Sequence, residues 1–80
     1  MSKDFSITVI SHNTLGILGE CLRRLEANYP EAELIVVDSA STDGSPDWVQ
    51  AHRPGVRLLR VANRGYAFAV NRGLEAATRP

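Results

Sequence analysis

The stretch Leu34-Ile35-Val36-Val37-Asp38-Ser39-Ala40-Ser41-Thr42-Asp43-Gly44-Ser45 decides how this chain folds. Its first four residues are apolar and mostly β-branched, which is typical of a strand buried on both faces. The run ends at Asp38, and small, polar or turn-forming residues follow. Ser45 is the predicted N-cap of a helix over residues 46–52, with proline at its first position and an acid in its first turn. This stretch therefore predicts a buried strand that delivers a carboxylate to a polar loop at its carboxyl end.

Two further strands and two further helices are predicted around this stretch. Residues 5–10 alternate between apolar and polar side chains, which indicates a strand. Residues 56–61 form another strand, and its two arginines favour a place at a sheet edge. Apolar side chains at helical spacing precede the central strand at Leu15, Leu18, Leu22, Leu25 and Tyr29, and follow the last strand at Tyr66, Val70, Leu74 and Ala77.

The resulting order is β-α-β-α-β-α, which predicts an α/β fold with a three-stranded parallel sheet and right-handed crossovers. A strand order of 3-2-1 follows if successive strands are neighbours and the most apolar strand is central. The 80 residues suffice for a single small domain. A domain of this size buries only about 60% of the surface of its unfolded chain and is marginally stable.

Composition excludes several classes of protein. Nine basic and nine acidic residues cancel, so no basic field favours nucleic acid. No apolar run approaches the roughly 20 residues of a membrane span, and the polar start at residues 1–4 does not fit a signal peptide. The chain has one cysteine, Cys21, which excludes an internal disulfide and favours a cytoplasmic location.

Three polar clusters directly follow the three predicted strands, and they are Ser11-His12-Asn13, residues 38–43 and Asn63-Arg64-Gly65. The carboxyl ends of parallel strands meet at one edge of a sheet, where ligands bind in open α/β folds. An unpaired carboxylate at Asp38 would suit donors such as ribose hydroxyls or a base N–H. Exposed loop amides would suit phosphates.

Structural interpretations of the same residues remain open. Asp38 can cap its own loop through backbone N–H groups, and Asp43-Gly44 is a common turn pair. His12 has no serine, cysteine or carboxylate placed beside it by spacing, which argues against a general base. Arg64 is commonly a solvated loop charge. The sequence carries neither a G-x-G-x-x-G nor a G-x-x-x-x-G-K-[ST] motif, which disfavours a dinucleotide fold and a P-loop.

Three motifs resemble those of family 2 glycosyltransferases, which have the GT-A nucleotide-sugar fold. That family shows a Thr-aromatic-Asn tripeptide after the first strand, then V-V-D-N-A-S-T-D-G-S, then N-x-G-F/Y-A-x-A-x-N-x-G. This chain has VISHN at residues 9–13, VVDSASTDGS at residues 36–45 and NRGYAFAVNRG at residues 63–73. The match covers nearly the whole chain in the family's order and spacing.

The resemblance implies binding of a UDP-, dTDP- or GDP-linked sugar. Asp38 would contact the base or ribose. Ser39 stands in the place of an Asn or Asp that in this family often helps to hold the base, and Asp43 lies in the same loop. Residues 11–13 would flank the base, and residues 63–65 would lie near the base or the diphosphate. Taken together, the implied nucleotide-binding residues are Ser11, His12, Asn13, Asp38, Ser39, Asp43, Asn63, Arg64 and Gly65.

The family's D-x-D motif, metal ligands and catalytic base come later than the segment that this chain resembles. Residues 1–80 are therefore expected to form the first half of a GT-A domain, without catalytic or metal-binding residues, and to be inactive alone. Manganese or magnesium is expected for the full-length family enzyme. The alternative is a non-catalytic half-domain that associates with itself, and a homodimer through the edge of the first strand is expected. A phospho-receiver is disfavoured because Ser11-His12-Asn13 and Ala62-Asn63 lack the acidic residues it needs.

Overall fold

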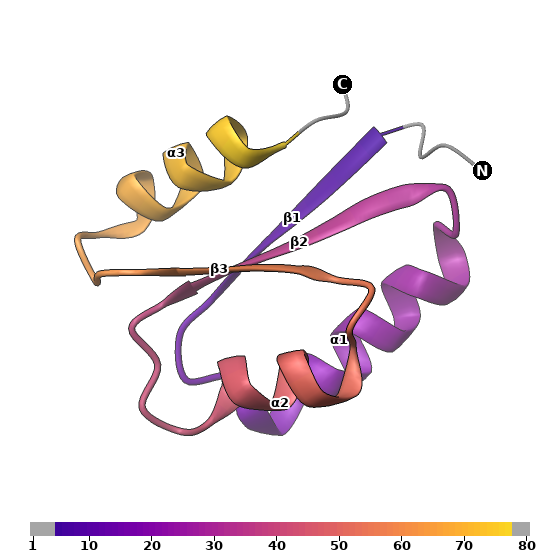
Figure 1. Cartoon of the computed structure of the whole chain (residues 1–80), viewed down its shortest axis with the longest axis horizontal. Helices are drawn as coiled ribbons and strands as arrows, with labels where there is room; N and C mark the ends of the chain where they lie inside the picture. The colour runs from indigo at the N-terminus through magenta and orange to yellow at the C-terminus, as the bar shows by residue number, and fades with distance from the viewer. Residues whose placement is uncertain (1–4, 78–80) are drawn as a thin grey trace.

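The computed structural model describes residues 5–77, in which a three-stranded parallel sheet lies between helices on its two faces (Figure 1). The polar start at residues 1–4 lies outside this described part. The elements in chain order are β1 (Phe5–Ser11), α1 (Leu15–Asn28), β2 (Ala32–Ser39), α2 (Ser45–His52), β3 (Arg57–Val61) and α3 (Tyr66–Ala76). The sheet order is β1-β2-β3, which confirms the predicted 3-2-1 order seen from the other edge.

The strand register aligns the carboxyl ends of the three strands. Ser11 of β1 is level with Asp38 of β2, and Asp38 is level with Arg60 of β3. Residues 34–39 of the central strand are all buried, as expected for a strand with neighbours on both sides and helices on both faces. The polar residues that follow each strand therefore emerge at the same edge of the sheet.

The side chains of β2 alternate between two apolar clusters. Leu34 and Val36 point to the face that α1 and α2 cover, where they pack with Leu22 and Val49. Ile35 and Val37 point to the opposite face, where they pack against Ala69 of α3 together with Ile10, Leu59 and Val61 of the outer strands. One face thus has two helices, and α3 is the helix on the other face (Figure 1).

The start of α2 and the inner stripe of α1 differ from the sequence prediction. Gly44, with a φ of 86°, is the N-cap of α2, and Ser45 is already the first helical residue. Leu18 and Leu22 are the buried residues of α1, whereas Leu15 and Tyr29 at the ends of its predicted stripe are exposed.

The inner surface of α3 also differs from the predicted apolar stripe. Its buried residues are Ala69 and Gly73, while Tyr66 and Leu74 are exposed. A Cβ atom built on Gly73 would lie 2.6 Å from Cγ2 of Thr8, so the helix passes very close to the sheet at this glycine. Ala69 and Gly73 therefore face the sheet, because small residues let the helix approach it closely. The larger side chains of Tyr66 and Leu74 lie outside this contact between helix and sheet.

Candidate functional site

At the carboxyl edge of the sheet, hydrogen bonds join two of the three loops directly and join the remaining loop to the end of β2. We name the three loops the first loop (residues 12–14), the second loop (residues 40–44) and the third loop (residues 62–65). The backbone N–H of Asn13 donates to Ser41 Oγ at 2.8 Å, and the N–H of Thr42 donates to Asn13 Oδ1 at 2.8 Å. Ser39 Oγ donates to Asn63 Oδ1 at 3.5 Å, which connects the end of β2 to the third loop. The predicted convergence of the three polar clusters is therefore present.

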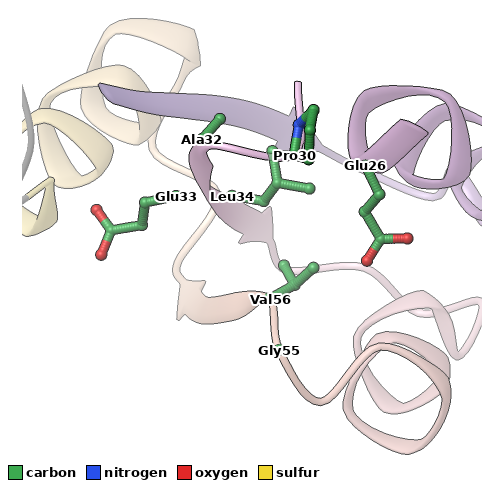
Figure 2. Close-up of a pocket in the computed structure, with 7 residues that line it drawn as sticks. All are labelled: Glu26, Pro30, Ala32, Glu33, Leu34, Gly55 and Val56. Atoms are coloured by element: carbon green, nitrogen blue, oxygen red, sulfur yellow. The ribbon is translucent and has the colours of Figure 1, made fainter. Parts of the chain in front are cut away.

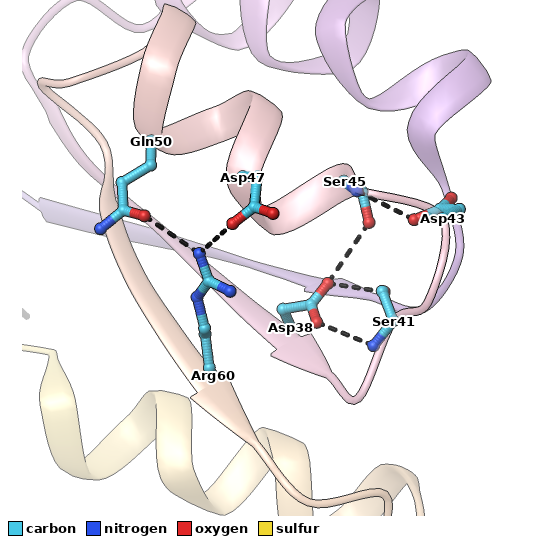
Figure 3. A network of polar contacts seen from close by, with 7 residues as sticks. All are labelled: Asp38, Ser41, Asp43, Ser45, Asp47, Gln50 and Arg60. Atoms are coloured by element: carbon cyan, nitrogen blue, oxygen red, sulfur yellow. Dashed lines mark hydrogen bonds and ion pairs between the residues drawn. The ribbon is translucent and has the colours of Figure 1, made fainter.

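Asp38 holds the second loop in place and does not offer the unpaired carboxylate that the sequence suggested. Its side chain is 2% exposed. Its Oδ2 accepts a hydrogen bond from the backbone N–H of Ser41 at 2.9 Å, and Oδ1 accepts one from Ser41 Oγ at 2.6 Å (Figure 3). Ser45 Oγ donates to the same Oδ1 at 3.5 Å. In this structure the Asp38 carboxylate therefore caps its own loop, as the structural interpretation of this residue predicted.

Asp43 joins the beginnings of two helices. Its Oδ1 accepts from the backbone N–H of Ser45 at 2.9 Å, and its Oδ2 accepts from the backbone N–H of Leu15 at 2.9 Å. These are first-turn N–H groups of α2 and α1, which have no partner inside their own helices. The hydrogen bonds from Ser45 and then Leu15 lower the pKa of the Asp43 carboxyl below its usual value, so this residue is ionised at neutral pH.

Ser11 and Ser39 are buried at the carboxyl ends of β1 and β2, whereas His12 is exposed. Ser11 is fully buried, and its hydroxyl is hydrogen-bonded to Thr14 Oγ1 at 2.7 Å. The Nδ1 of His12 is hydrogen-bonded to the carbonyl oxygen of Ser39. Because a carbonyl only accepts, Nδ1 carries the proton, and in the neutral ring Nε2 is an acceptor. That acceptor lies 3.4 Å from Nδ2 of Asn13.

The third loop is the most exposed part of the cluster. Asn63, Arg64 and Gly65 are all exposed, and Gly65 precedes α3 with a φ of 94°. The guanidinium carbon of Arg64 lies 4.9 Å from the centre of the Phe68 ring, which is a cation–π contact. Arg64 is therefore held over the first turn of α3, where backbone N–H groups and a guanidinium together suit an anion.

The loop cluster does not present a group of ligands for a divalent cation. Within residues 5–77, no three His, Cys, Asp or Glu side chains are close enough to hold a metal ion. The two carboxylates nearest the loops, Asp38 and Asp43, accept hydrogen bonds from the protein's own N–H and O–H groups. The residues described here therefore do not fit a divalent metal.

A hollow lies away from these loops, at the amino end of the sheet (Figure 2). It has a volume of about 430 Å³ and lies between the end of α1 and the start of β2, with Glu26, Ala32 and Val56 in its lining. None of the predicted site residues lines this hollow. In addition, no helix in the described part of the chain is long and apolar enough to cross a membrane.

Three residues with a role in the cluster were not among the predicted nucleotide-binding residues, although Ser41 lies in the predicted polar cluster at residues 38–43. Ser41 and Ser45 hold the Asp38 carboxylate, and Thr14 holds Ser11. Serine three residues after an aspartate is a known pattern of local capping, so Ser41 carried a usable signal. The hydrogen bond from Ser45 to Asp38 depends on the path of the second loop between β2 and α2, and no local pattern in the sequence indicates that path.

Ala40 has a backbone conformation that is unfavourable for its residue type. Its φ is 51°, in the left-handed region that glycine adopts without a steric penalty, and its N–H donates to the carbonyl of Val61 at 3.0 Å. We expect Ala40→Gly to raise the free energy of unfolding by about 1 kcal/mol in urea denaturation. The matched control is Gly44→Ala, at a φ of 86°, which should lower it by a similar amount. A lower stability of Ala40→Gly would contradict this account of the second loop.

The structure is an open parallel α/β sheet, and in sheets of this kind ligands bind outside the carboxyl ends of the strands, where the three loops lie. The sequence model of Glycosyl transferase family 2 matches residues 6–80, and the chain belongs to this family. The resemblance noted in the sequence is thereby confirmed.

Individual proteins agree with this assignment. The chain is 31% identical over 81 residues to the uncharacterized glycosyltransferase YibD of Escherichia coli, and 35% identical over 78 residues to the lipopolysaccharide core biosynthesis glycosyltransferase LpsC of Rhizobium meliloti. These alignments cover 96% and 94% of the chain, but 24% and 28% of the two relatives. The chain therefore spans about a quarter of the length of the curated relatives that it matches.

A solved structure has the same fold. It is the mannosyltransferase PcManGT from Pyrobaculum calidifontis in complex with GDP-Man and Mn²⁺, with a TM-score of 0.75 and 33% sequence identity. The match covers 98% of this chain and 25% of the mannosyltransferase chain. The predicted GT-A-like arrangement of strands and helices is therefore confirmed.

Proposed function

We propose that these residues bind the nucleotide-sugar donor of a glycosyltransferase at the cluster of three loops. The observation that carries the proposal is the set of hydrogen bonds that joins two of the loops and links the third to the end of β2, at the carboxyl edge of the sheet, in a chain of glycosyl transferase family 2. The mannosyltransferase of the same fold was solved with GDP-Man, which supports a nucleoside diphosphate sugar as the ligand class. For this segment we propose donor binding alone. The transfer of the sugar is a proposal for the whole protein.

The exposed groups of the cluster suit the parts of such a donor. The side-chain amides of Asn13 and Asn63 combine donors and acceptors, which match the edge of a base and the hydroxyls of a ribose. Arg64 at the start of α3 suits the diphosphate. Because Asp38 and Ser39 are buried and bonded within the protein, we propose that they position the loops and that the exposed residues make the direct contacts.

The proposal includes a metal only for the whole protein. The solved mannosyltransferase contains Mn²⁺, which supports a divalent cation as part of the family's chemistry. Since Asp38 and Asp43 are engaged by loop N–H and O–H groups, we expect donor binding by this chain to be nearly independent of manganese. An enzyme that supplies its own metal ligands should instead bind the donor more tightly when manganese is present.

A titration followed by nuclear magnetic resonance tests the proposal. GDP-mannose, UDP-glucose and dTDP-glucose, each with and without manganese, should shift the amide signals of His12, Asn13 and Asn63 more than those at the opposite end of the sheet. Asn63→Ala should weaken binding about three- to tenfold, since it removes about one hydrogen bond. Asn28→Ala, an exposed asparagine at the end of α1, is the matched control and should leave binding unchanged. Shifts centred on the hollow near Ala32 would place the ligand at the wrong end of the sheet and refute the proposal.

A further inference from the structure

Two arginines share one aromatic ring at the start of α3. The guanidinium carbon of Arg64 lies 4.9 Å from the centre of the Phe68 ring, and that of Arg72 lies 5.3 Å from the same centre. Side chains four residues apart are neighbours on a helix surface. Long side chains of a helix also lean toward its amino end, over the preceding turn. This direction brings the Phe68 ring to Arg64, in the loop before the helix.

Glu75 makes the two arginines different from each other. Its Oε1 lies 3.2 Å from Nη2 of Arg72, so Arg72 has a carboxylate partner on the same helix. Among residues 5–77, no carboxylate pairs with Arg64, and its contact is the Phe68 ring. The positive charge of Arg72 is therefore offset by its neighbour, and the charge of Arg64 remains available to a ligand.

The contact of Arg64 also differs in kind from those of the other arginines within residues 5–77. Each of these has an oxygen partner, either a carboxylate or a main-chain carbonyl, and they are Arg23, Arg24, Arg53, Arg57, Arg60 and Arg72. A cation–π contact is made with the face of an aromatic ring and uses no N–H donor. The planar set of donors on Arg64 therefore stays free, and such a set binds phosphate oxygens in pairs.

The backbone of Arg64 is held on both sides. Before it, Asn63 Oδ1 accepts a hydrogen bond from Ser39 Oγ at the end of β2. After it, Gly65 has a φ of 94°, and its carbonyl oxygen accepts the N–H of Ala69 at 3.3 Å. The ring contact then limits the long side chain of Arg64, whose rotamer freedom would otherwise be lost when a ligand binds. Both the backbone and the guanidinium are thus placed before any ligand arrives.

We propose that Phe68 is a positioning residue for donor binding, which holds the Arg64 guanidinium ready to bind the diphosphate of the nucleotide-sugar. This role rests on the proposed function, because the donor has to bind at the three loops. It extends the binding machinery to a side chain of α3 that lies outside those loops. Arg64, Phe68 and Arg72 fall at positions that the motif N-x-G-F/Y-A-x-A-x-N-x-G leaves open, so the arrangement belongs to this chain's own sequence.

Titrations of GDP and UDP, each compared with its nucleoside, test this role by nuclear magnetic resonance. Arg64→Ala should raise the dissociation constants of both diphosphates by at least about tenfold, because it removes hydrogen bonds between charged groups. Phe68→Leu removes the ring and should raise them about two- to fivefold. Phe68→Tyr keeps the ring and should bind as the wild type does. Guanosine and uridine have no diphosphate, so their dissociation constants should stay unchanged in all three variants.

A double-mutant cycle separates positioning from a purely structural role. Because Phe68 acts through Arg64, Phe68→Leu should have no further effect on diphosphate binding in a chain that already carries Arg64→Ala. The ring current of Phe68 should also shift the side-chain proton signals of Arg64 upfield in the free protein, and Phe68→Leu should abolish this shift. Phe5→Leu is the matched control, since Phe5 is also half-buried but its ring contacts Tyr29 at the other end of the sheet. It should leave binding unchanged.

Failure of donor binding and failure of the Phe68 role give different results. If no nucleotide shifts the signals of the three loops in the wild type, donor binding is refuted, and the role of Phe68 with it. If the diphosphates bind at the loops but Phe68→Leu leaves their dissociation constants unchanged, the role of Phe68 alone is refuted. An equal effect of Phe68→Leu with and without Arg64→Ala also refutes it, because the ring would then support the fold and not the guanidinium.

Discussion

Asp38→Ala should lower the free energy of unfolding by about 3 kcal/mol, because hydrogen bonds to a charged acceptor each contribute about 1.5–3 kcal/mol. The substitution removes the acceptor of the Ser41 N–H, the Ser41 hydroxyl and the Ser45 hydroxyl at once. Since Ser45 is fully buried, its hydroxyl would lose a partner in a place where water does not replace it. A domain of 80 residues has a stability of about 4–12 kcal/mol in total, so this single change should leave a marginal fold.

Urea denaturation followed by circular dichroism measures this effect. Asp47→Asn is the matched control, because Asp47 is largely exposed and its contact at 2.7 Å is an ion pair with Arg60 at the surface (Figure 3). That pair should contribute less than about 1 kcal/mol. Asp38→Asn, which keeps an acceptor for the Ser41 N–H, should lie between the two. If Asp38→Ala were as stable as the wild type, the carboxylate would not be holding the second loop, and its assignment as a positioning residue would fail.

The order and direction of the strands could be predicted from the sequence because they depend on patterns of burial. An unbroken apolar run at residues 34–37 requires cover on both faces and neighbours on both sides, which places it in the centre of a parallel sheet. Once the strands are parallel, the residues that follow them must meet at one edge. The convergence of Asn13, Ser41 and Asn63 is therefore a consequence of topology, and it needed no knowledge of individual hydrogen bonds.

The partners of the Asp38 carboxylate could not be predicted in the same way. They depend on the path of the second loop, in which Ala40 adopts a left-handed backbone conformation. That conformation is usually adopted by glycine or asparagine, so the sequence does not indicate it at an alanine. The side of α3 that faces the sheet was also not predictable from periodicity. A hydrophobic stripe marks Tyr66, Val70 and Leu74, but close approach of the helix selects the smallest residues, Ala69 and Gly73.

Gly73→Ala should lower the free energy of unfolding by about 2 kcal/mol, which is an overpacking cost of about 3 kcal/mol less the gain in helix propensity. The new Cβ would lie 2.6 Å from Cγ2 of Thr8 and 3.2 Å from Cγ2 of Val37. Both neighbours are β-branched side chains of the sheet, whose χ1 angles have little freedom to move away. Alanine favours the helix over glycine by up to about 1 kcal/mol, so the measured loss is the overpacking cost reduced by this gain.

A double-mutant cycle with Thr8→Ser shows whether the cause is this one contact. Serine keeps the hydroxyl of Thr8 but removes Cγ2, the atom nearest to the new methyl group. The double variant should therefore be more stable than the sum of the two single changes by about 1 kcal/mol, which is within the range found for residues in contact. Gly16→Ala is the matched control, since no atom lies within 4 Å of its added Cβ, and it should stabilise α1 by up to about 1 kcal/mol. Strict additivity in the cycle would contradict the close approach of α3 to β1, and with it the reason why Tyr66 and Leu74 lie outside the core.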